Sequence, residues 1–160
     1  SKTDPSGVHD APINPMKKLV TSGATFIARS HASQVKHMME MYERAIAHNG
    51  FSVIEILSEC TEFYPDAFDA AIPRKGGEFK VIEEKKDDFT TEDDERHDVR
   101  DEKAAYRLAD LTWPGVFGVF YECTRSTKNE MEKTLIEKSQ AEKGHLNTID
   151  HLQETFDRMK

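Results

Sequence analysis

The alternation of apolar and polar positions predicts a strand–helix–strand unit in the first third of the chain. Apolar residues gather in residues 24–28 and again in residues 51–57. Between them, over residues 34–48, apolar side chains recur at helical spacing and form one face. The members of this face are Val35, Met38, Met39, Tyr42, Ala45 and Ile46. A helix of this length between two strands is a βαβ unit with parallel strands, so we expect an α/β fold with a parallel sheet flanked by helices.

Capping signals set the expected boundaries of the helices in this region. Asn14 before Pro15 is typical of an N-cap followed by proline at the first helical position, which predicts a short helix to about Ser22. Gly23 is expected to end that helix in the left-handed conformation. Ser33 is the expected N-cap of the longer helix.

The middle of the chain is more polar and is expected to hold one small hairpin and one helix. Gly76-Gly77 predicts a turn of a hairpin within residues 74–82. Residues 83–102 carry eleven acidic and four basic residues, which is typical of a solvated loop that passes into a helix. Thr91 is expected to cap this helix. The helix would run to about residue 111 and bury Val99, Ala104, Leu108 and Leu111.

Pro114-Gly115 predicts a turn before the last strand and the C-terminal tail. Residues 116–121 are apolar on both faces, as in a central strand of a parallel sheet. Residues 126–160 are charged and helical in period, and Gly144 is expected to divide them into two helices. The sequence therefore predicts two parts, an α/β domain over residues 1–125 and a helical C-terminal tail over residues 126–160.

Composition and charge exclude several classes of protein. The formal net charge is −8, whereas binding to nucleic acid or to an anionic membrane needs clustered Lys and Arg. The longest apolar run is too short to cross a bilayer, and no basic-then-apolar leader opens the chain. Two cysteines do not make a disulfide framework, so we expect a reduced, cytoplasmic setting. The first residue, Ser1, reads as a boundary within a longer polypeptide.

Familiar catalytic motifs are missing from the sequence, and Cys60 is the candidate that stands out. There is no glycine-rich phosphate loop, nucleophile elbow or His-Glu-x-x-His motif. The seven histidines are not spaced to share a metal, and the acidic pairs Asp87-Asp88 and Asp93-Asp94 have no apolar surroundings to shift their pKa values.

Cys60 follows the strand over residues 51–57, and ligands gather beyond the carboxyl ends of parallel strands. A thiolate there could bind iron or zinc, although one cysteine cannot complete a site. The alternative is a small buried hydrophobic side chain, which is the common role of a free cysteine. We expect that structural role for Cys123.

Three segments resemble the β subunit of 2-oxoacid:ferredoxin oxidoreductases, which are thiamine-diphosphate and iron–sulfur enzymes. The first holds Lys-Thr-Asp-Pro-Ser-Gly at residues 2–7 and Ala-Pro-Ile-Asn-Pro at residues 11–15. The second is the most specific: Gly-Ala-Thr-Phe-Ile-Ala-Arg at residues 23–29, a helix, and then Gly-Phe through Leu-Ser-Glu-Cys at residues 50–60. The third holds His97-Asp98 and the helix after it, then Gly-Val-Phe-Tyr at 118–121.

The resemblance implies that residues 1–125 are the C-terminal part of a thiamine-diphosphate-binding α/β domain. It implies CoA-dependent oxidative decarboxylation of a 2-oxoacid, with electrons passed through a 4Fe–4S cluster to ferredoxin. The cysteine matching Cys60 is the fourth ligand of that cluster in the family. The implied cofactors are thiamine diphosphate, Mg²⁺ and the 4Fe–4S cluster. The implied partners are an α subunit, ferredoxin, CoA and the 2-oxoacid.

Two departures from the family pattern qualify this reading. The Gly-Asp-Gly…Asn motif for magnesium and diphosphate, and the Cys-x-x-Cys that supplies further cluster ligands, are missing from these 160 residues. We therefore expect the isolated chain to be incomplete and inactive. The family's Pro before the cysteine is Glu59 here, which adds a negative charge beside the expected cluster. The alternatives are a noncatalytic interaction domain that retains the scaffold, and a thiamine enzyme that passes electrons elsewhere or not at all.

Overall fold

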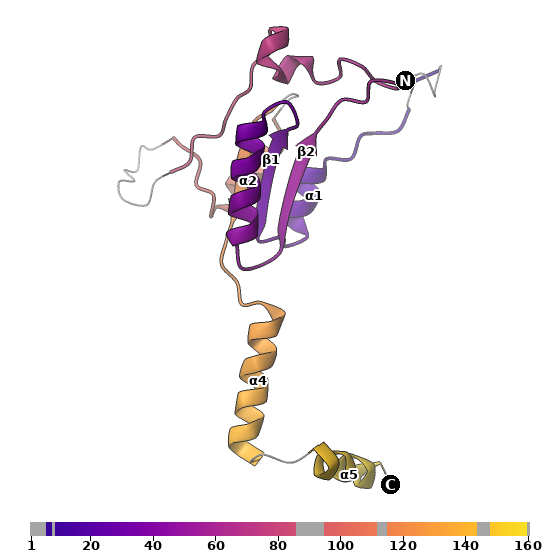
Figure 1. The fold of residues 1–160 in the computed structure, drawn as a ribbon, viewed down its shortest axis with the longest axis vertical. Helices are drawn as coiled ribbons and strands as arrows, with labels where there is room; N and C mark the ends of the chain where they lie inside the picture. The colour runs from indigo at the N-terminus through magenta and orange to yellow at the C-terminus, as the bar shows by residue number, and fades with distance from the viewer. Residues whose placement is uncertain (1–5, 8, 86–94, 112–114, 144–147, 160) are drawn as a thin grey trace. The chain divides into compact units, whose positions relative to one another are not determined.

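The computed structural model describes residues 6–7, 9–85, 95–111, 115–143 and 148–159. It divides into two units, Ser1–Arg125 and Ser126–Lys160. Figure 1 shows the ribbon, with labels on most of its helices and strands.

A three-stranded sheet in the order β2-β1-β3 forms the centre of the first unit. β1 (Phe26–His31) pairs in parallel with β2 (Ser52–Leu57), and α2 (Val35–Ala47) connects the two. The predicted βαβ unit and the α/β class are therefore confirmed. The first strand begins two residues later than the apolar pattern indicated and continues to His31, because all six of its residues are buried between the neighbouring strands and helices.

The last strand differs from its prediction as a central parallel strand. β3 (Gly118–Glu122) pairs with β1 in the antiparallel direction, so the sheet is mixed. Both faces of β3 are apolar because each packs in a core cluster, Phe120 with Met16 of α1 and Val119 with Met41 of α2. The chain also covers the outer edge of the sheet beside β3. There, the Phe117 N–H donates to the Lys80 carbonyl at 2.8 Å and the Ile82 N–H donates to the Phe117 carbonyl at 2.7 Å.

The first helix forms as the capping residues predicted. α1 (Pro15–Thr21) starts with Pro15 at its first position, and the Asn14 side chain accepts a hydrogen bond from the Lys17 N–H at 3.1 Å. Gly23 follows with φ of +78°, a conformation that glycine adopts without strain. The residues at this end of the chain thus fix where the helix begins and ends.

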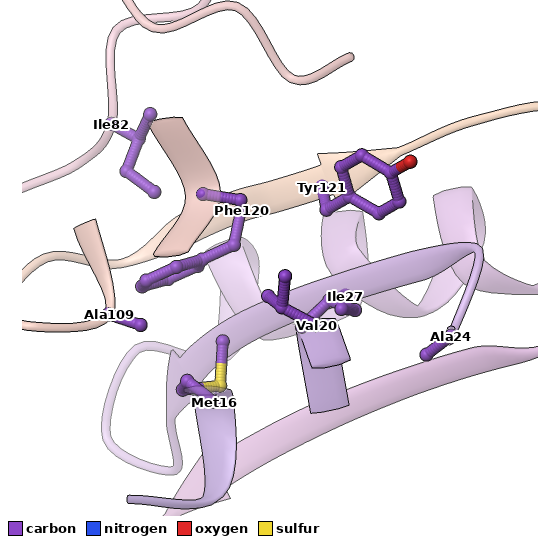
Figure 2. Packing of buried hydrophobic residues seen from close by; sticks show 9 residues of the cluster. Met16, Val20, Ala24, Ile27, Ile82, Ala109, Phe120 and Tyr121 are labelled. Atoms are coloured by element: carbon purple, nitrogen blue, oxygen red, sulfur yellow. The ribbon is translucent and has the colours of Figure 1, made fainter. Parts of the chain in front are cut away.

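Helices α1 and α2 cover opposite faces of the sheet (Figure 1). Figure 2 shows the larger cluster, in which Met16 and Val20 of α1 lie against Ile27 of β1 and Phe120 of β3. The smaller cluster places Met41 of α2 against the other side of the sheet. The members of that second cluster are Phe26, Ala28, Met41 and Val119.

The predicted apolar face of α2 is only partly turned to the sheet: Ala45 packs against the second cluster, but the helix is rotated so that four other members of the face are exposed. Val35, Met39, Tyr42 and Ile46 are between 45% and 83% exposed, while Met41 is buried. The side toward the sheet also carries polar groups, each with a tertiary partner. His37 Nδ1 lies 2.8 Å from Ser30 Oγ, His48 Nε2 lies 2.9 Å from Thr25 Oγ1, and Arg44 binds both Glu84 and Glu122.

Other local predictions are corrected in the same region. Ser33 does not cap α2: Gln34 holds that position without a side-chain hydrogen bond, while the Ser33 hydroxyl lies 2.8 Å from His31 Nδ1. The hairpin expected over residues 74–82 does not form: these residues begin in a short 3₁₀ helix, Pro73–Lys75, which follows another at Asp69–Ala71. Gly76 ends the second one with φ of +84°.

The helix expected to end near residue 111 is shorter than its apolar pattern suggested. α3 (Glu102–Leu108) is capped by Asp101, whose carboxylate accepts from the Lys103 N–H at 2.8 Å. Ala105 is its buried residue, and Leu111 beyond it is 49% exposed. Thr91, the predicted cap, lies outside the described residues.

The second unit consists of two helices, α4 (Lys128–Lys143) and α5 (Thr148–Arg158), as the tail pattern predicted. Gly144, the predicted break, lies outside the described residues. Across the described part of the chain, none of the helices has the length and apolar character needed to cross a membrane.

Candidate metal-ligand site

Cys60 lies beyond the carboxyl ends of the two parallel strands. β2 ends at Leu57, and Leu57 stands opposite His31, the last residue of β1. The thiol therefore occupies the edge of the sheet where α/β proteins place their ligands. The Cys60 side chain is exposed, which contradicts the alternative prediction that Cys60 is a small buried hydrophobic residue.

The backbone after Cys60 folds back around the thiol. Hydrogen bonding from the backbone of Phe63, then of Glu62 and Tyr64, lowers the pKa of the Cys60 thiol. The Tyr64 N–H also donates to the Cys60 carbonyl at 3.0 Å. Because the thiolate is the form that binds metals and attacks electrophiles, this turn favours the chemically competent state of Cys60.

Cys123 lies at the opposite end of the sheet. It follows β3, which runs antiparallel to β1, and Glu122 at the end of β3 stands opposite Phe26 at the start of β1. The length of β1 separates the two ends by roughly 20 Å, taking about 3.3 Å per residue. Both cysteines are free, and they cannot bind the same metal ion or form a disulfide with each other.

Glu59, the residue that departs from the family pattern, has a partner from a segment far along the chain. Lys75 Nζ lies 3.0 Å from Glu59, 3.0 Å from Asp66 and 2.6 Å from Asp69. Hydrogen bonds to Asp69, then Asp66 and Glu59, raise the pKa of Lys75 well above its ordinary value. The charge of Glu59 is therefore balanced locally by an ammonium group.

These three carboxylates also have the spacing of a cation site, since their oxygens lie within 4.8 Å of one another. The ammonium group of Lys75 already contacts all three of them. A metal ion would have to displace that cation, so we do not assign a metal to this cluster.

His31 closes the same end of the sheet from the side of β1. It is 2% exposed, and burial lowers the pKa of its imidazole from the ordinary value of 6.5. Its Nδ1 lies 2.8 Å from Ser33 Oγ and accepts from the Ser33 N–H at 3.1 Å. Its ring lies edge-on to Phe68 with centroids 5.7 Å apart. The neutral imidazole thus helps to pack the residues after Cys60 against β1.

A cavity of about 310 Å³ lies on the α1 side of the sheet. Inside it, Arg29 Nε donates to Glu55 Oε2 at 2.5 Å, and the guanidinium of Arg29 stacks 5.3 Å from the centroid of the Phe120 ring. The cavity walls are otherwise mainly apolar and include Pro12, Ile13, Leu57, Ala109 and Leu111. Such a pocket, apolar with one ion pair, suits a small organic group better than a bare ion.

The sequence located Cys60 but not its surroundings. Lys75, Asp66 and Asp69 gave no signal, because they are joined to Glu59 only by tertiary contacts. The acidic pairs Asp87-Asp88 and Asp93-Asp94 lie outside the described residues. Within the described part of the chain, the group of side chains with the spacing of a metal site is Glu59, Asp66 and Asp69, and it includes no histidine.

Comparison with known proteins identifies relatives for about half of the chain. No protein-family model matches it. It is 36% identical over 63 residues to a 2-oxoacid:ferredoxin oxidoreductase β subunit of Saccharolobus solfataricus, which covers 39% of this chain and 21% of that protein. It is 34% identical over 82 residues to 2-oxoglutarate oxidoreductase subunit KorB of Mycobacterium tuberculosis, covering 51% of this chain and 22% of that protein.

A solved structure shares the fold over almost the whole chain. It is a 2-oxoglutarate:ferredoxin oxidoreductase from Magnetococcus marinus with 2-oxoglutarate, coenzyme A and succinyl-CoA bound. The TM-score is 0.67 at 24% identity, and the match covers 96% of this chain and 47% of that one. This chain therefore spans about half the length of the solved relative, and its matched segments span about a fifth of the curated relatives.

Proposed function

We propose that this chain, a relative of the β subunits of 2-oxoacid:ferredoxin oxidoreductases, is the C-terminal part of such a subunit. In this proposal residues 1–125 complete a thiamine-diphosphate-binding domain, and residues 126–160 form its helical tail. The complete enzyme would decarboxylate a 2-oxoacid oxidatively, transfer the acyl group to coenzyme A and pass the electrons to ferredoxin.

The observation that carries the proposal is the setting of Cys60. The resemblance implies a cluster ligand at this position, and the structure has there an exposed thiol whose pKa is lowered by hydrogen bonds from the backbone of residues 62–64. Such hydrogen bonds are one of the levers that tune iron–sulfur clusters. A merely structural cysteine would be expected inside one of the apolar clusters, and Cys60 belongs to neither.

The donor set fits one ligand of a 4Fe–4S cluster and no more. Cys60 would hold one iron through its thiolate, and Cys123 is too distant to hold another, so the remaining ligands belong to residues outside this chain. A bound cluster supplies one-electron steps between the decarboxylation chemistry and ferredoxin. Thiamine diphosphate and Mg²⁺ would likewise be held mainly by residues outside this chain. The cavity beside Arg29 would be the contribution of this chain to a small-molecule site.

An α subunit and ferredoxin would be the protein partners, and a 2-oxoacid and CoA the substrates. The acidic net charge argues against nucleic acid and anionic membranes as further partners. Two cysteines that are both free suit the reducing cytoplasm.

A second candidate function rests on the exposed apolar residues of α2. Val35, Met39, Tyr42 and Ile46 lie along one side of the helix and are all exposed. Contiguous apolar surface of this kind marks protein interaction sites. A noncatalytic interaction domain that kept the scaffold would use this face and would have no need of the Cys60 thiol.

Substitution of Cys60 in the complete enzyme separates the two functions. We expect Cys60→Ser to lower the iron content and to abolish ferredoxin reduction, while the circular-dichroism spectrum stays unchanged. Cys123→Ser is the matched control and should retain the iron. Unchanged iron content in Cys60→Ser would refute the ligand assignment and favour the interaction domain. Retained iron in both variants with normal 2-oxoacid decarboxylation would indicate a thiamine enzyme with another electron acceptor.

A further inference from the structure

The sheet of the first unit has one closed edge and one open edge. Beside β3, the Glu122 N–H donates to the Val99 carbonyl at 2.8 Å, so groups outside the sheet occupy this edge. His97 Nε2 also lies 2.8 Å from the Phe120 carbonyl oxygen. β2 forms the opposite edge (Figure 1), and among the described residues no strand lies beyond it. An unpaired edge strand is a template for pairing with another chain.

The open edge of β2 presents a row of backbone groups. The carbonyls of Phe51 and Leu57, at the two ends of this strand, accept hydrogen bonds from the N–H groups of residues 26 and 32 at 3.2 and 2.9 Å. Because the backbone groups of successive residues point to alternate sides of a strand, those of Ser52, Ile54 and Ile56 point away from β1. These three residues therefore offer the N–H and C=O groups that an added strand would bind.

The sequence of β2 does not protect this edge. Exposed edges are usually guarded by lysine, proline or a bulge. β2 instead reads Ser-Val-Ile-Glu-Ile-Leu and keeps a regular register with β1 over six residue pairs. Its one charged side chain, Glu55, binds Arg29 at 2.5 Å. All six residues of β2 are half-buried, whereas all six of β1 are buried, so β2 has the composition of an interior strand in an edge position.

The side of α2 next to this edge is apolar and uncharged. Arg44 marks the side toward β3, because it binds Glu122 at 2.9 Å. At 3.6 residues per turn, Val35 and Tyr42 lie on the opposite side of the helix and therefore next to the β2 edge. They are 54% and 45% exposed. The charged residues of α2 all lie about a quarter turn or more away from them; these are Lys36, Glu40, Glu43 and Arg44.

We propose that the open edge of β2 and this side of α2 join two copies of the chain around a two-fold axis. The axis makes the two β2 strands antiparallel and joins the two three-stranded sheets into one. Because α2 contacts both β1 and β2, the two α2 helices then lie on the same face about two strand spacings apart. That separation is about 10 Å, the ordinary distance between packed helices. Val35 and Tyr42 of each copy face the same residues of the other.

A second copy is the occupant that the charges favour. The chain carries a formal net charge of −8, so two copies repel each other in most orientations. The proposed contact includes no charged residue of α2, and the single acid of β2 is already paired with Arg29. Since the β3 edge is closed, the pairing ends at a dimer and does not extend into a filament.

The test measures the mass of the 160-residue chain in solution by sedimentation, across a dilution series and in reducing agent so that Cys60 forms no crosslink. Tyr42→Glu and Val35→Glu each place a carboxylate at the proposed contact. Ile136→Glu is the matched control, because Ile136 lies on α4 and is 56% exposed. Circular dichroism is recorded for every variant to check the fold.

We expect a mass of twice the 18.3 kDa of one chain at high concentration, falling to one chain on dilution. Tyr42→Glu and Val35→Glu should each raise the dissociation constant of the dimer about tenfold or more, because two carboxylates then meet across the axis. Ile136→Glu should leave the dissociation constant unchanged. All three variants should keep the circular-dichroism spectrum, since the replaced side chains are exposed.

Amide hydrogen exchange locates the contact on β2. In the dimer, the amides of Ser52, Ile54 and Ile56 should exchange about tenfold or more slowly than in the diluted monomer, because they gain acceptors from the added strand. The amides of Val53 and Glu55 point toward β1 and should change much less.

A chain that stays monomeric at the highest concentration would overturn the inference. So would a dimer that both glutamate substitutions leave unchanged, an assembly that grows beyond a dimer, or a dimer in which Ser52, Ile54 and Ile56 exchange as fast as in the monomer. The inference does not rest on the proposed function, because it uses neither Cys60 nor any cofactor. The iron content of Cys60→Ser therefore tests the proposed function separately.

Discussion

Two adjacent glycines after the Lys75 turn should respond very differently to the same substitution. Gly76 has φ of +84° and open space around the position of a Cβ atom. Gly77 has ordinary backbone angles, but a Cβ there would lie 2.6 Å from the carbonyl carbon and oxygen of Ala70 and nearer still to the Asp69 carbonyl oxygen. Gly76→Ala therefore strains its own backbone conformation. Gly77→Ala instead clashes with the backbone of Asp69 and Ala70, which must shift to make room.

The expected costs follow from these two situations. Strain at Gly76→Ala amounts to about 1 to 2 kcal/mol. Gly77→Ala pushes the first 3₁₀ helix away and strains the bonds from the Gly77 N–H to the Ile72 carbonyl (3.1 Å) and from the Glu78 N–H to the Ala70 carbonyl (2.9 Å). Two weakened hydrogen bonds at about 1 kcal/mol each, plus overpacking of about 1 to 3 kcal/mol, give a loss of roughly 3 to 5 kcal/mol.

The assay is urea denaturation of both variants, with amide hydrogen exchange at residues 69–78 to detect local opening of this segment. Gly77→Ala should lower the free energy of unfolding, or the local protection, clearly more than Gly76→Ala does. A Gly77→Ala variant that is as stable and as protected as Gly76→Ala would refute the reasoning, because the close approach of the two backbones would then not be real.

Two further predictions concern the core and the pH dependence of stability. Met16→Ala should lower the free energy of unfolding by about 2 to 5 kcal/mol, because Met16 is fully buried. Met159→Ala is the control: Met159 is 72% exposed, so its loss should change the free energy of unfolding by less than about 0.5 kcal/mol. Equal effects of the two substitutions in urea denaturation would contradict the packing in Figure 2. Burial lowers the pKa of His31, so below pH 6.5 the unfolded chain takes up a proton before the folded chain does, and stability should fall as the pH falls through this range. His31→Gln should make that fall shallower in denaturation curves between about pH 5 and 7, and an unchanged slope would argue against a buried neutral imidazole.

The parallel strands and their connection could be predicted because each depends on neighbouring residues. A run of apolar residues, a helical period and a second run specify a βαβ unit over residues 26–57, and Asn14, Pro15 and Gly23 set the ends of α1 by local capping. Cys60 could be placed beyond the sheet for the same reason, because it stands three residues after the last residue of β2.

The direction of β3 and the orientation of α2 were decided only by tertiary contacts. Nothing local to residues 118–122 encodes that they pair antiparallel with β1, since that pairing joins segments nearly a hundred residues apart. Likewise, the inward side of α2 looks polar in the sequence, and it can be buried only because Arg44 meets Glu84 and Glu122 there.

The sequence by itself determined the α/β class, the βαβ unit and the position of the Cys60 thiol, because short-range periodicity and capping act between residues a few positions apart. Only the tertiary structure decided what surrounds that thiol. Lys75 lies fifteen residues after Cys60 in the sequence, and its three carboxylate partners are Glu59, Asp66 and Asp69. Ion pairs of this kind leave no periodic pattern, because their geometry depends on how the chain folds back on itself.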